Sequence, residues 1–285
     1  MRSYTKIGIL LLFSILITVF VSPIVAGICR FNFFSIMSRT ILVVTLLLFF
    51  YYRDRLGITT IGFELNRKWW LLLLTGFALG LFSLGAVSLV MVRVSIRYIV
   101  SDIKNIDWLT ALAGYLATGF TVALIEECFF RGFILQALLK DTKLITALVI
   151  TNVFYSAVHF LRPTAVKGIG ELHLWNSLCA VPLFFKPLVS DFMQIWPSFI
   201  GLFLVGVVLS LAYIRIKQLS LPIGLHAGWV VGIKSLSMGT DVSVGGGLWA
   251  NGKVVAHPLG WLMLLVFILI LGWPYYLNGT GKQVR

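Results

Sequence analysis

Two adjacent glutamates inside a long apolar run are the residues of this chain best suited to chemistry. Glu126 and Glu127 lie within Trp108–Leu139, and Arg131 follows Glu127 by one helical turn. A charged side chain inside a membrane span costs roughly 2.5–3.5 kcal/mol on insertion scales, so it requires a partner or a function. Glu127 and Arg131 are spaced i, i+4 and can neutralise each other.

His159 lies in the next apolar run, Leu144–Leu161, beyond a tight turn near Lys140–Lys143. Glu126 and His159 are each about 16 residues from this turn, which at 1.5 Å rise per residue places both at about 24 Å along their helices. We therefore expect the two side chains to face each other. A carboxylate and an imidazole away from bulk water can form a general-base pair or a metal-ligand pair.

Two further features extend this candidate site. Asn152, Ser156 and His159 recur at i, i+4 and i+7 and predict a polar stripe on one helix face, as a hydrated cavity would need. His226 lies among small residues in Gly224–Trp229, which allow another helix to approach closely. Counting residues from the nearest turn does not place His226 level with Glu126, so its position stays open.

Each histidine taken singly is better explained as a hydrogen-bonded packing residue, and it is the combination that indicates a site. Glu171, His173 and His257 fall in predicted loops. We expect these three side chains to be solvated and to take no part in catalysis.

The composition predicts an all-α, polytopic transmembrane helix bundle. The chain has 285 residues, of which 59% are hydrophobic and 12% charged, whereas soluble domains carry about 25% charged residues. About 20 apolar residues cross a bilayer as helix. About eight spans are expected, at Ile7–Cys29, Phe34–Tyr52, Trp69–Val92, Trp108–Leu139, Leu144–Leu161, Trp196–Ile216, Leu219–Met238 and Pro258–Leu277.

Charge patterning predicts the orientation and the surroundings of the chain. The first apolar run is longer than a signal-peptide core, so we interpret it as the first span. If the N-terminus is cytoplasmic, the segments on the cytoplasmic side contain more lysine and arginine than those on the other side. Basic residues are retained preferentially in the cytoplasm, so this distribution favours cytoplasmic N- and C-termini. The short loops suggest a bacterial inner membrane. The net charge of +13 fits contact with anionic lipid headgroups, and no motif indicates a nucleic-acid partner.

Three sequence elements together resemble the CAAX-protease and bacteriocin-processing (CPBP, Abi) family of intramembrane endopeptidases. Glu126-Glu127-Cys128-Phe129-Phe130-Arg131 is similar to its E-E-x-x-x-R signature. Tyr155-Ser156-Ala157-Val158-His159 is similar to the second element, an aromatic residue followed four residues later by His, and His226 to the third. The resemblance covers Trp108–Met238. It divides the chain into N-terminal helices (1–107), a catalytic core (108–238), and a loop with the last helix (239–285).

The resemblance implies hydrolysis of peptide bonds in membrane-associated or C-terminally modified peptides. Glu126 would activate a water that His159 also orients, and His226 would stabilise the oxyanion. Glu127 and Arg131 would maintain the geometry and charge of the site. The resemblance equally allows a zinc ion held by Glu126, His159 and His226, with water in the open position. The sequence does not separate the two mechanisms.

One departure from the family pattern supports a different reading. Val230 stands four residues after His226, where the family commonly has an Asn or Asp that helps to hold the oxyanion. Either Asn152 or Arg131 supplies the donor, or activity is weak or absent. The first alternative function is therefore an inactive immunity, scaffold or maturation partner. The second is an ion-coupled transporter, which predicts inverted repeats that the sequence does not show.

The segment Arg162–Ile195 contains Pro163, Pro182 and Pro187 between two apolar runs. We interpret it as a loop, and its length suggests a gate over the mouth of the cavity. The oligomeric state and the identity of the substrate are open at this level.

Overall fold

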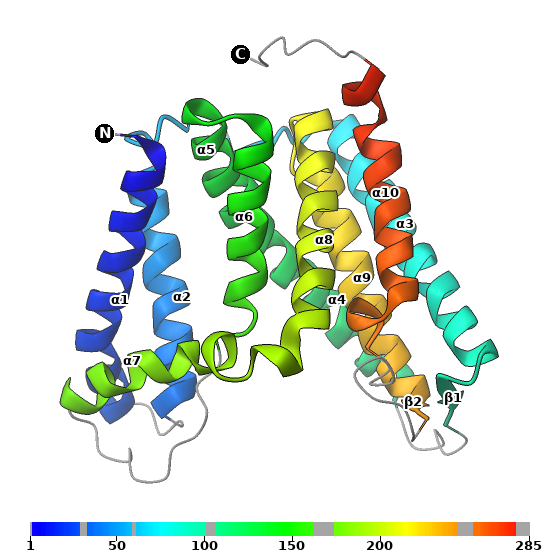
Figure 1. Ribbon diagram of the computed structural model, residues 1–285, viewed down its shortest axis with the longest axis horizontal. Helices are drawn as coiled ribbons and strands as arrows, with labels where there is room; N and C mark the ends of the chain where they lie inside the picture. The colour runs from blue at the N-terminus through cyan, green and yellow to red at the C-terminus, as the bar shows by residue number, and fades with distance from the viewer. Residues whose placement is uncertain are drawn as a thin grey trace. The chain divides into compact units, whose positions relative to one another are not determined.

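A computed structural model of the chain (Figure 1) describes residues 2–28, 33–58, 61–100, 107–161, 174–243 and 253–277. Its helices and strands follow one another in the order α1 (Ser3–Ile28), α2 (Phe33–Tyr51), α3 (Arg67–Arg93), β1 (Arg97–Ile99), α4 (Trp108–Glu127), the π-helix η1 (Cys128–Leu135), α5 (Gln136–Asp141), α6 (Leu144–Val158), α7 (Leu174–Val189), α8 (Phe192–Ile216), α9 (Ser220–Gly239), β2 (Thr240–Val242), the 3₁₀-helix η3 (Val254–Ala256) and α10 (Pro258–Leu277).

The chain is an all-α, membrane-type helix bundle, as its composition predicts. Each of the eight expected apolar runs overlaps a helix. Among the described residues, four helical stretches are long and apolar enough to cross a membrane, namely Ser3–Ile28, Arg67–Arg93, Trp108–Asp141 and Phe192–Ile216. The protein is therefore an integral membrane protein. Its small β1–β2 pair is antiparallel, with Tyr98 opposite Asp241.

Polar residues cap two of the long helices where the sequence leaves a loop. The side chain of Asn66 accepts a hydrogen bond from the backbone N–H of Trp69 at 2.9 Å. Asp107 accepts from the N–H groups of Leu109 and Thr110 at 3.2 and 3.3 Å. Hydrogen bonds from Thr110 hold the pKa of the Asp107 carboxyl below its usual value. Such caps satisfy donors that a helix start otherwise leaves unpaired.

The described residues form two compact units. The first contains residues 1–61 and 132–196, and the second contains 62–131 and 197–285. In the first unit the ends of α1 and α5 are joined by the Asp141 carboxylate, which accepts a hydrogen bond from the backbone N–H of Ser3. Lys140 donates to the carbonyl oxygens of Leu56 and Gly57, which follow α2.

The second unit is organised by close contact between α3 and α9. Gly76 and Gly80 of α3 meet Gly224 and Gly228 of α9. A Cβ at Gly76 would lie 2.5 Å from the carbonyl oxygen of Leu221. A Cβ at Gly80 would collide with the carbonyl oxygen of Leu225. Small residues at every fourth position let two backbones approach in this way. The prediction of a close approach at the glycines around His226 is therefore confirmed.

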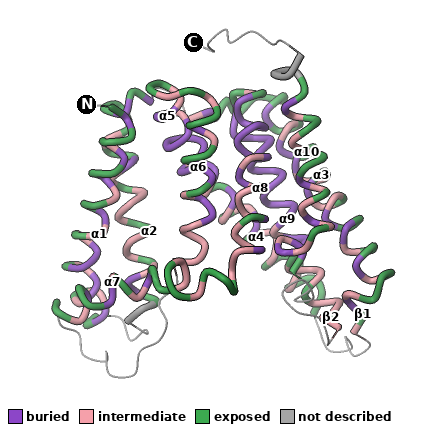
Figure 2. The backbone as a smooth tube through the Cα atoms, viewed as in Figure 1, coloured by how far each residue is buried: buried purple, intermediate pink, exposed green. Residues whose placement is uncertain are grey.

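An apolar cluster extends from this contact to α8 and α10. It includes Leu84 and Met91 of α3, Leu209 of α8, Trp229 of α9 and Leu264 of α10. The indole N–H of Trp229 donates to the Ser83 hydroxyl at 3.1 Å. Figure 2 shows the buried stretch along α8 and α9 that results. The helix that carries His226 is therefore fixed on several sides.

The local structure departs from a regular α-helix in one segment and is helical in another where a loop is expected. The run from Trp108 is not one uniform α-helix, because residues 128–135 form the π-helix η1. A π-helix has a wider turn with i→i+5 bonds, so the rise of 1.5 Å per residue does not hold through this segment. That Glu126 and His159 face each other stays a prediction. The segment interpreted as a loop contains α7, whose internal Pro182 and Pro187 concealed it. Residues 162–173 lie outside the described part.

Adding a methyl group at Gly80 should destabilise the protein. Overpacking a tight contact costs about 1–3 kcal/mol, and the neighbour here is backbone that cannot move aside. The matched control is Gly85 on the same helix, where a Cβ meets nothing within 4 Å. Thermal unfolding in detergent should show a lowered midpoint for Gly80→Ala and an unchanged or raised one for Gly85→Ala. Equal midpoints would contradict the contact.

Candidate active site

Glu127 is the centre of a buried network in the second unit. It ends α4, and its side chain is fully buried. Its Oε1 accepts hydrogen bonds from Arg131 Nη1 at 2.9 Å and from His226 Nδ1 at 2.8 Å. One oxygen of Glu127 therefore connects the guanidinium of Arg131, one turn further along the chain, with the imidazole of His226 on α9.

Arg131 is buried completely and is engaged on two sides. Besides Glu127, its guanidinium donates through Nη2 to the backbone carbonyl of Gly206 on α8, at 2.9 Å. Breaking a buried pair leaves an uncompensated charge, which is strongly destabilising. Arg131 therefore anchors Glu127 between α4 and α8.

His226 lies between the two glutamates and is 5% exposed. An ionised carboxylate can only accept a hydrogen bond, so Nδ1 of His226 carries the proton that Glu127 receives. Nε2 then faces Glu126 Oε2 at 3.8 Å. This distance exceeds a direct hydrogen bond. The Glu126 side chain is 25% exposed, in contrast to Glu127.

His159 belongs to the first unit, where it follows the last residue of α6. Its Nδ1 lies 2.7 Å from the carbonyl oxygen of Tyr155, and the two rings pack with centroids 4.6 Å apart. A carbonyl can only accept, so Nδ1 carries the proton and Nε2 of the neutral ring is the acceptor atom. Tyr155, the aromatic residue of the motif, thereby sets the orientation and tautomer of His159.

The structure thus brings together Glu126, Glu127, Arg131 and His226 within one unit. The position of His226, which counting along the sequence left open, follows from the contact of α9 with α3 and α4. The carbonyl of Gly206 is a participant that sequence reasoning missed. A backbone acceptor has no side-chain signature, so no signal in the sequence could have indicated it.

The remaining candidate residues differ in their burial. Asn152 and Ser156 are buried on α6, and the Asn152 amide donates to the carbonyl of Leu148 at 2.8 Å. His257 is half-buried rather than solvated, and Nδ1 accepts from the N–H of Leu259. Burial lowers the pKa of His257. Glu171 and His173 lie outside the described residues.

A zinc site would need a group of His, Cys, Asp or Glu side chains as ligands. Within these ranges, no three His, Cys, Asp or Glu side chains are grouped so that they could hold a metal ion. In the network itself, Nδ1 of His226 bonds Glu127, and Nε2 faces Glu126. Glu126 and His226 lie in the second unit and His159 in the first.

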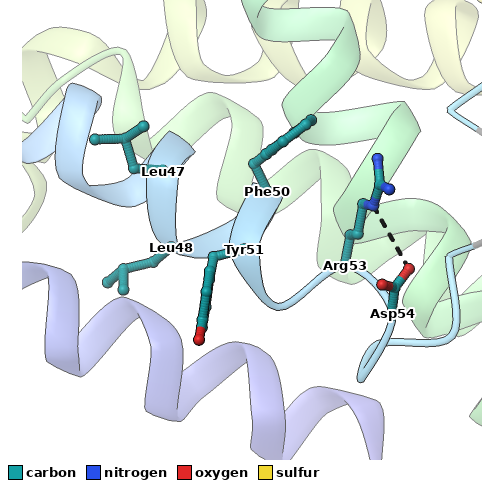
Figure 3. Close-up of a pocket in the computed structure, with 6 residues that line it drawn as sticks. All are labelled: Leu47, Leu48, Phe50, Tyr51, Arg53 and Asp54. Atoms are coloured by element: carbon teal, nitrogen blue, oxygen red, sulfur yellow. Dashed lines mark ion pairs between the residues drawn. The ribbon is translucent and has the colours of Figure 1, made fainter.

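A pocket of about 550 Å³ lies elsewhere, at the C-terminal end of α2 (Figure 3). Its lining combines apolar side chains with Arg53 and Asp54, whose charged groups pair at 3.5 Å. The Asp54 side chain is 83% exposed. A solvated ion pair of this kind contributes little to stability. The lining contains no imidazole and no second carboxylate. This pocket is not the candidate active site.

Comparison with known proteins agrees with the location of the buried network. Residues 108–232 match the family model described as Rce1-like, type II CAAX prenyl endopeptidase Rce1-like. This segment, which is less than half of the chain, is similar to CAAX proteases. The matched segment of this CAAX protease-like chain includes both glutamates, Arg131 and the two histidines, and it confirms the resemblance noted over Trp108–Met238. No curated protein and no solved structure matches the chain.

Removing the guanidinium of Arg131 should be more damaging than removing both charges of the pair. Arg131→Met leaves Glu127 buried without its cation, at a cost of about 3–5 kcal/mol. Glu127→Gln in the same chain removes the orphaned charge, so the double variant should recover part of the loss. Unfolding of the four members of this cycle in detergent measures the coupling. Additive losses would contradict the network.

Proposed function

We propose that the protein is an intramembrane endopeptidase that hydrolyses peptide bonds of membrane-associated or C-terminally modified peptides. The family match supports a CAAX-type intramembrane endopeptidase in general. The observation that carries the proposal for this chain is the position of His226, with Nδ1 on Glu127 and Nε2 directed at the more exposed Glu126. A carboxylate beside an oriented imidazole is a common arrangement for general acid–base catalysis.

In the proposed reaction Glu126 takes a proton from a water molecule. The water oxygen forms a bond to the carbonyl carbon of the substrate, and the carbonyl oxygen becomes an oxyanion. The carbon–nitrogen bond then breaks as Glu126 returns the proton to the leaving amine. Both ends of the cleaved peptide are thus accounted for, and Glu126 is restored as a carboxylate.

His226 and His159 have separate roles in this scheme. His226, when Nε2 is also protonated, donates a hydrogen bond to the oxyanion. Glu127 and Arg131 are positioning residues, because they fix the ring of His226 and touch no reacting atom. The role of His159 in orienting the water rests on the family resemblance, and its Nε2 acceptor is suited to receive a hydrogen bond from that water.

The location of the reaction is also a proposal. We assign the chain to a bacterial inner membrane with both termini in the cytoplasm, from the distribution of basic residues and the short loops. The bilayer and a peptide or protein substrate within it are the partners, and no nucleic acid is involved. A metal-dependent reaction and an inactive family member are the two outcomes that the experiments below would separate from this scheme.

Cleavage should depend on Glu126 and His159. We expect Glu126→Gln and His159→Ala to lower the cleavage rate by about 10²–10⁴-fold, the usual contribution of a general base or its partner. The measurement is cleavage of a peptide library by protein in nanodiscs, followed by mass spectrometry. His257→Ala is the control, since His257 lies outside the network.

A chelator arm tests the metal alternative in the same assay. Activity that persists in the chelator agrees with catalysis by side chains alone, whereas loss that added zinc restores would favour a metalloprotease. If folded wild type cleaves nothing, or both variants cleave as well as wild type, the catalytic assignments are wrong. The inactive immunity or maturation partner is then the better description.

A substitution at Val230 should increase the activity. Val230 lies one helical turn beyond His226 on α9, is half-buried and has no hydrogen-bond donor in its side chain. Removing one oxyanion donor typically costs about 10²–10³ in rate, so Val230→Asn should raise kcat, with Val230→Leu as the size control. An unchanged rate would show that another group already supplies this donor.

A further inference from the structure

Helix α7 lies across the ends of α1 and α2 in the first unit (Figure 1). Its buried residues Ala180 and Phe184 pack in one apolar cluster with Val19 and Ala26 of α1. The same cluster includes Ile36 and Met37 of α2. Ala26 is near the last residue of α1, and Ile36 is near the first of α2. Helix α7 therefore lies at the level where this helical hairpin turns.

The face of α7 that points away from the cluster is apolar. The residues on it are separated by four, four, three and four positions, so they form one stripe along the helix. They are Leu174, Leu178, Pro182, Phe185 and Val189, with Trp175 beside them. Trp175 is 70% exposed and Val189 79% exposed. A surface helix in water has polar residues on this face, so the stripe does not face water.

The length of α7 decides between crossing the bilayer and lying along its surface. Its 16 residues extend about 24 Å at 1.5 Å per residue, which is less than the ~30 Å hydrocarbon thickness. The two internal prolines, Pro182 and Pro187, also weaken a helix that stands alone in lipid. An orientation in the plane of the bilayer suits this length, and the cluster with α1 and α2 holds the helix there.

The neighbouring helix shows what covers the stripe. Near the same end of α1, Phe20, Ile24 and Ile28 are 59%, 66% and 79% exposed. These side chains belong to a helix long and apolar enough to cross the membrane, so lipid surrounds them. Helix α7 packs on the same end of α1 through Val19 and Ala26. Trp175 and the exposed Lys186 are residue types favoured at the boundary between headgroups and acyl chains.

We propose that α7 is an interfacial helix whose apolar stripe is embedded in the acyl boundary of the leaflet at which α1 ends and α2 begins. The occupant of this surface is the lipid bilayer itself. The inference replaces the loop interpretation of this segment and does not depend on the proposed function, because an inactive protein would carry the same helix.

Depth-dependent fluorescence quenching in nanodiscs tests this proposal. In a full-length background with Cys29, Cys128 and Cys179 replaced by alanine, an environment-sensitive dye is attached at Leu178→Cys or Phe185→Cys. Both positions are exposed in the stripe, and Val189→Cys substitutes for either if a variant fails to fold. Ile24→Cys provides a lipid-facing reference. Asp54→Cys provides an aqueous one.

We expect blue-shifted emission at both positions, with stronger quenching by a spin label near the headgroup than by one deep in the acyl chain. The two depths should be equal, because the helix lies in the plane. Three results would overturn the proposal. They are iodide quenching equal to that at Asp54→Cys, which means water; clearly unequal depths, which mean insertion; and protection from both lipid and aqueous quenchers, which means a protein cover.

Discussion

The contact between the glycine faces of α3 and α9 is the constraint on which the candidate site depends. In lipid, helices gain little from burying apolar side chains against each other, so close packing of small residues drives their association. Gly224 and Gly228 lie on either side of His226 in the sequence. Their approach to α3 fixes both the rotation and the height of α9. The imidazole consequently meets Glu127 at hydrogen-bond distance.

Burying Glu127 and Arg131 away from lipid and water carries a large desolvation cost. The cost is tolerable because the carboxylate receives two donors on one oxygen and the guanidinium reaches a backbone carbonyl on a third helix. A buried ion pair is weak evidence for added stability. Here it connects α4, α8 and α9, and its effect is to orient His226 toward Glu126. Two adjacent glutamates thus have different surroundings, one buried in the network and the other partly exposed.

The π-helix η1 begins directly after the two glutamates and contains Arg131. π-helical turns inside α-helices are uncommon and occur often at functional sites. In this chain the wider turn lies at the point where Arg131 must reach both Glu127, on the preceding turn, and Gly206 on α8. The irregular backbone and the buried ion pair therefore occupy the same few residues.

The sequence by itself determined the membrane class, the helical runs and the identity of the polar residues, because charged groups inside apolar runs are conspicuous and costly. The i, i+4 pairing of Glu127 with Arg131 was also readable from spacing. Only the tertiary structure decided that His226 bonds Glu127, that Gly206 accepts from Arg131, and that α7 is a helix. The first two depend on how distant segments pack, and a backbone acceptor has no side-chain signature. The third was concealed by Pro182 and Pro187, since proline is unusual inside a helix.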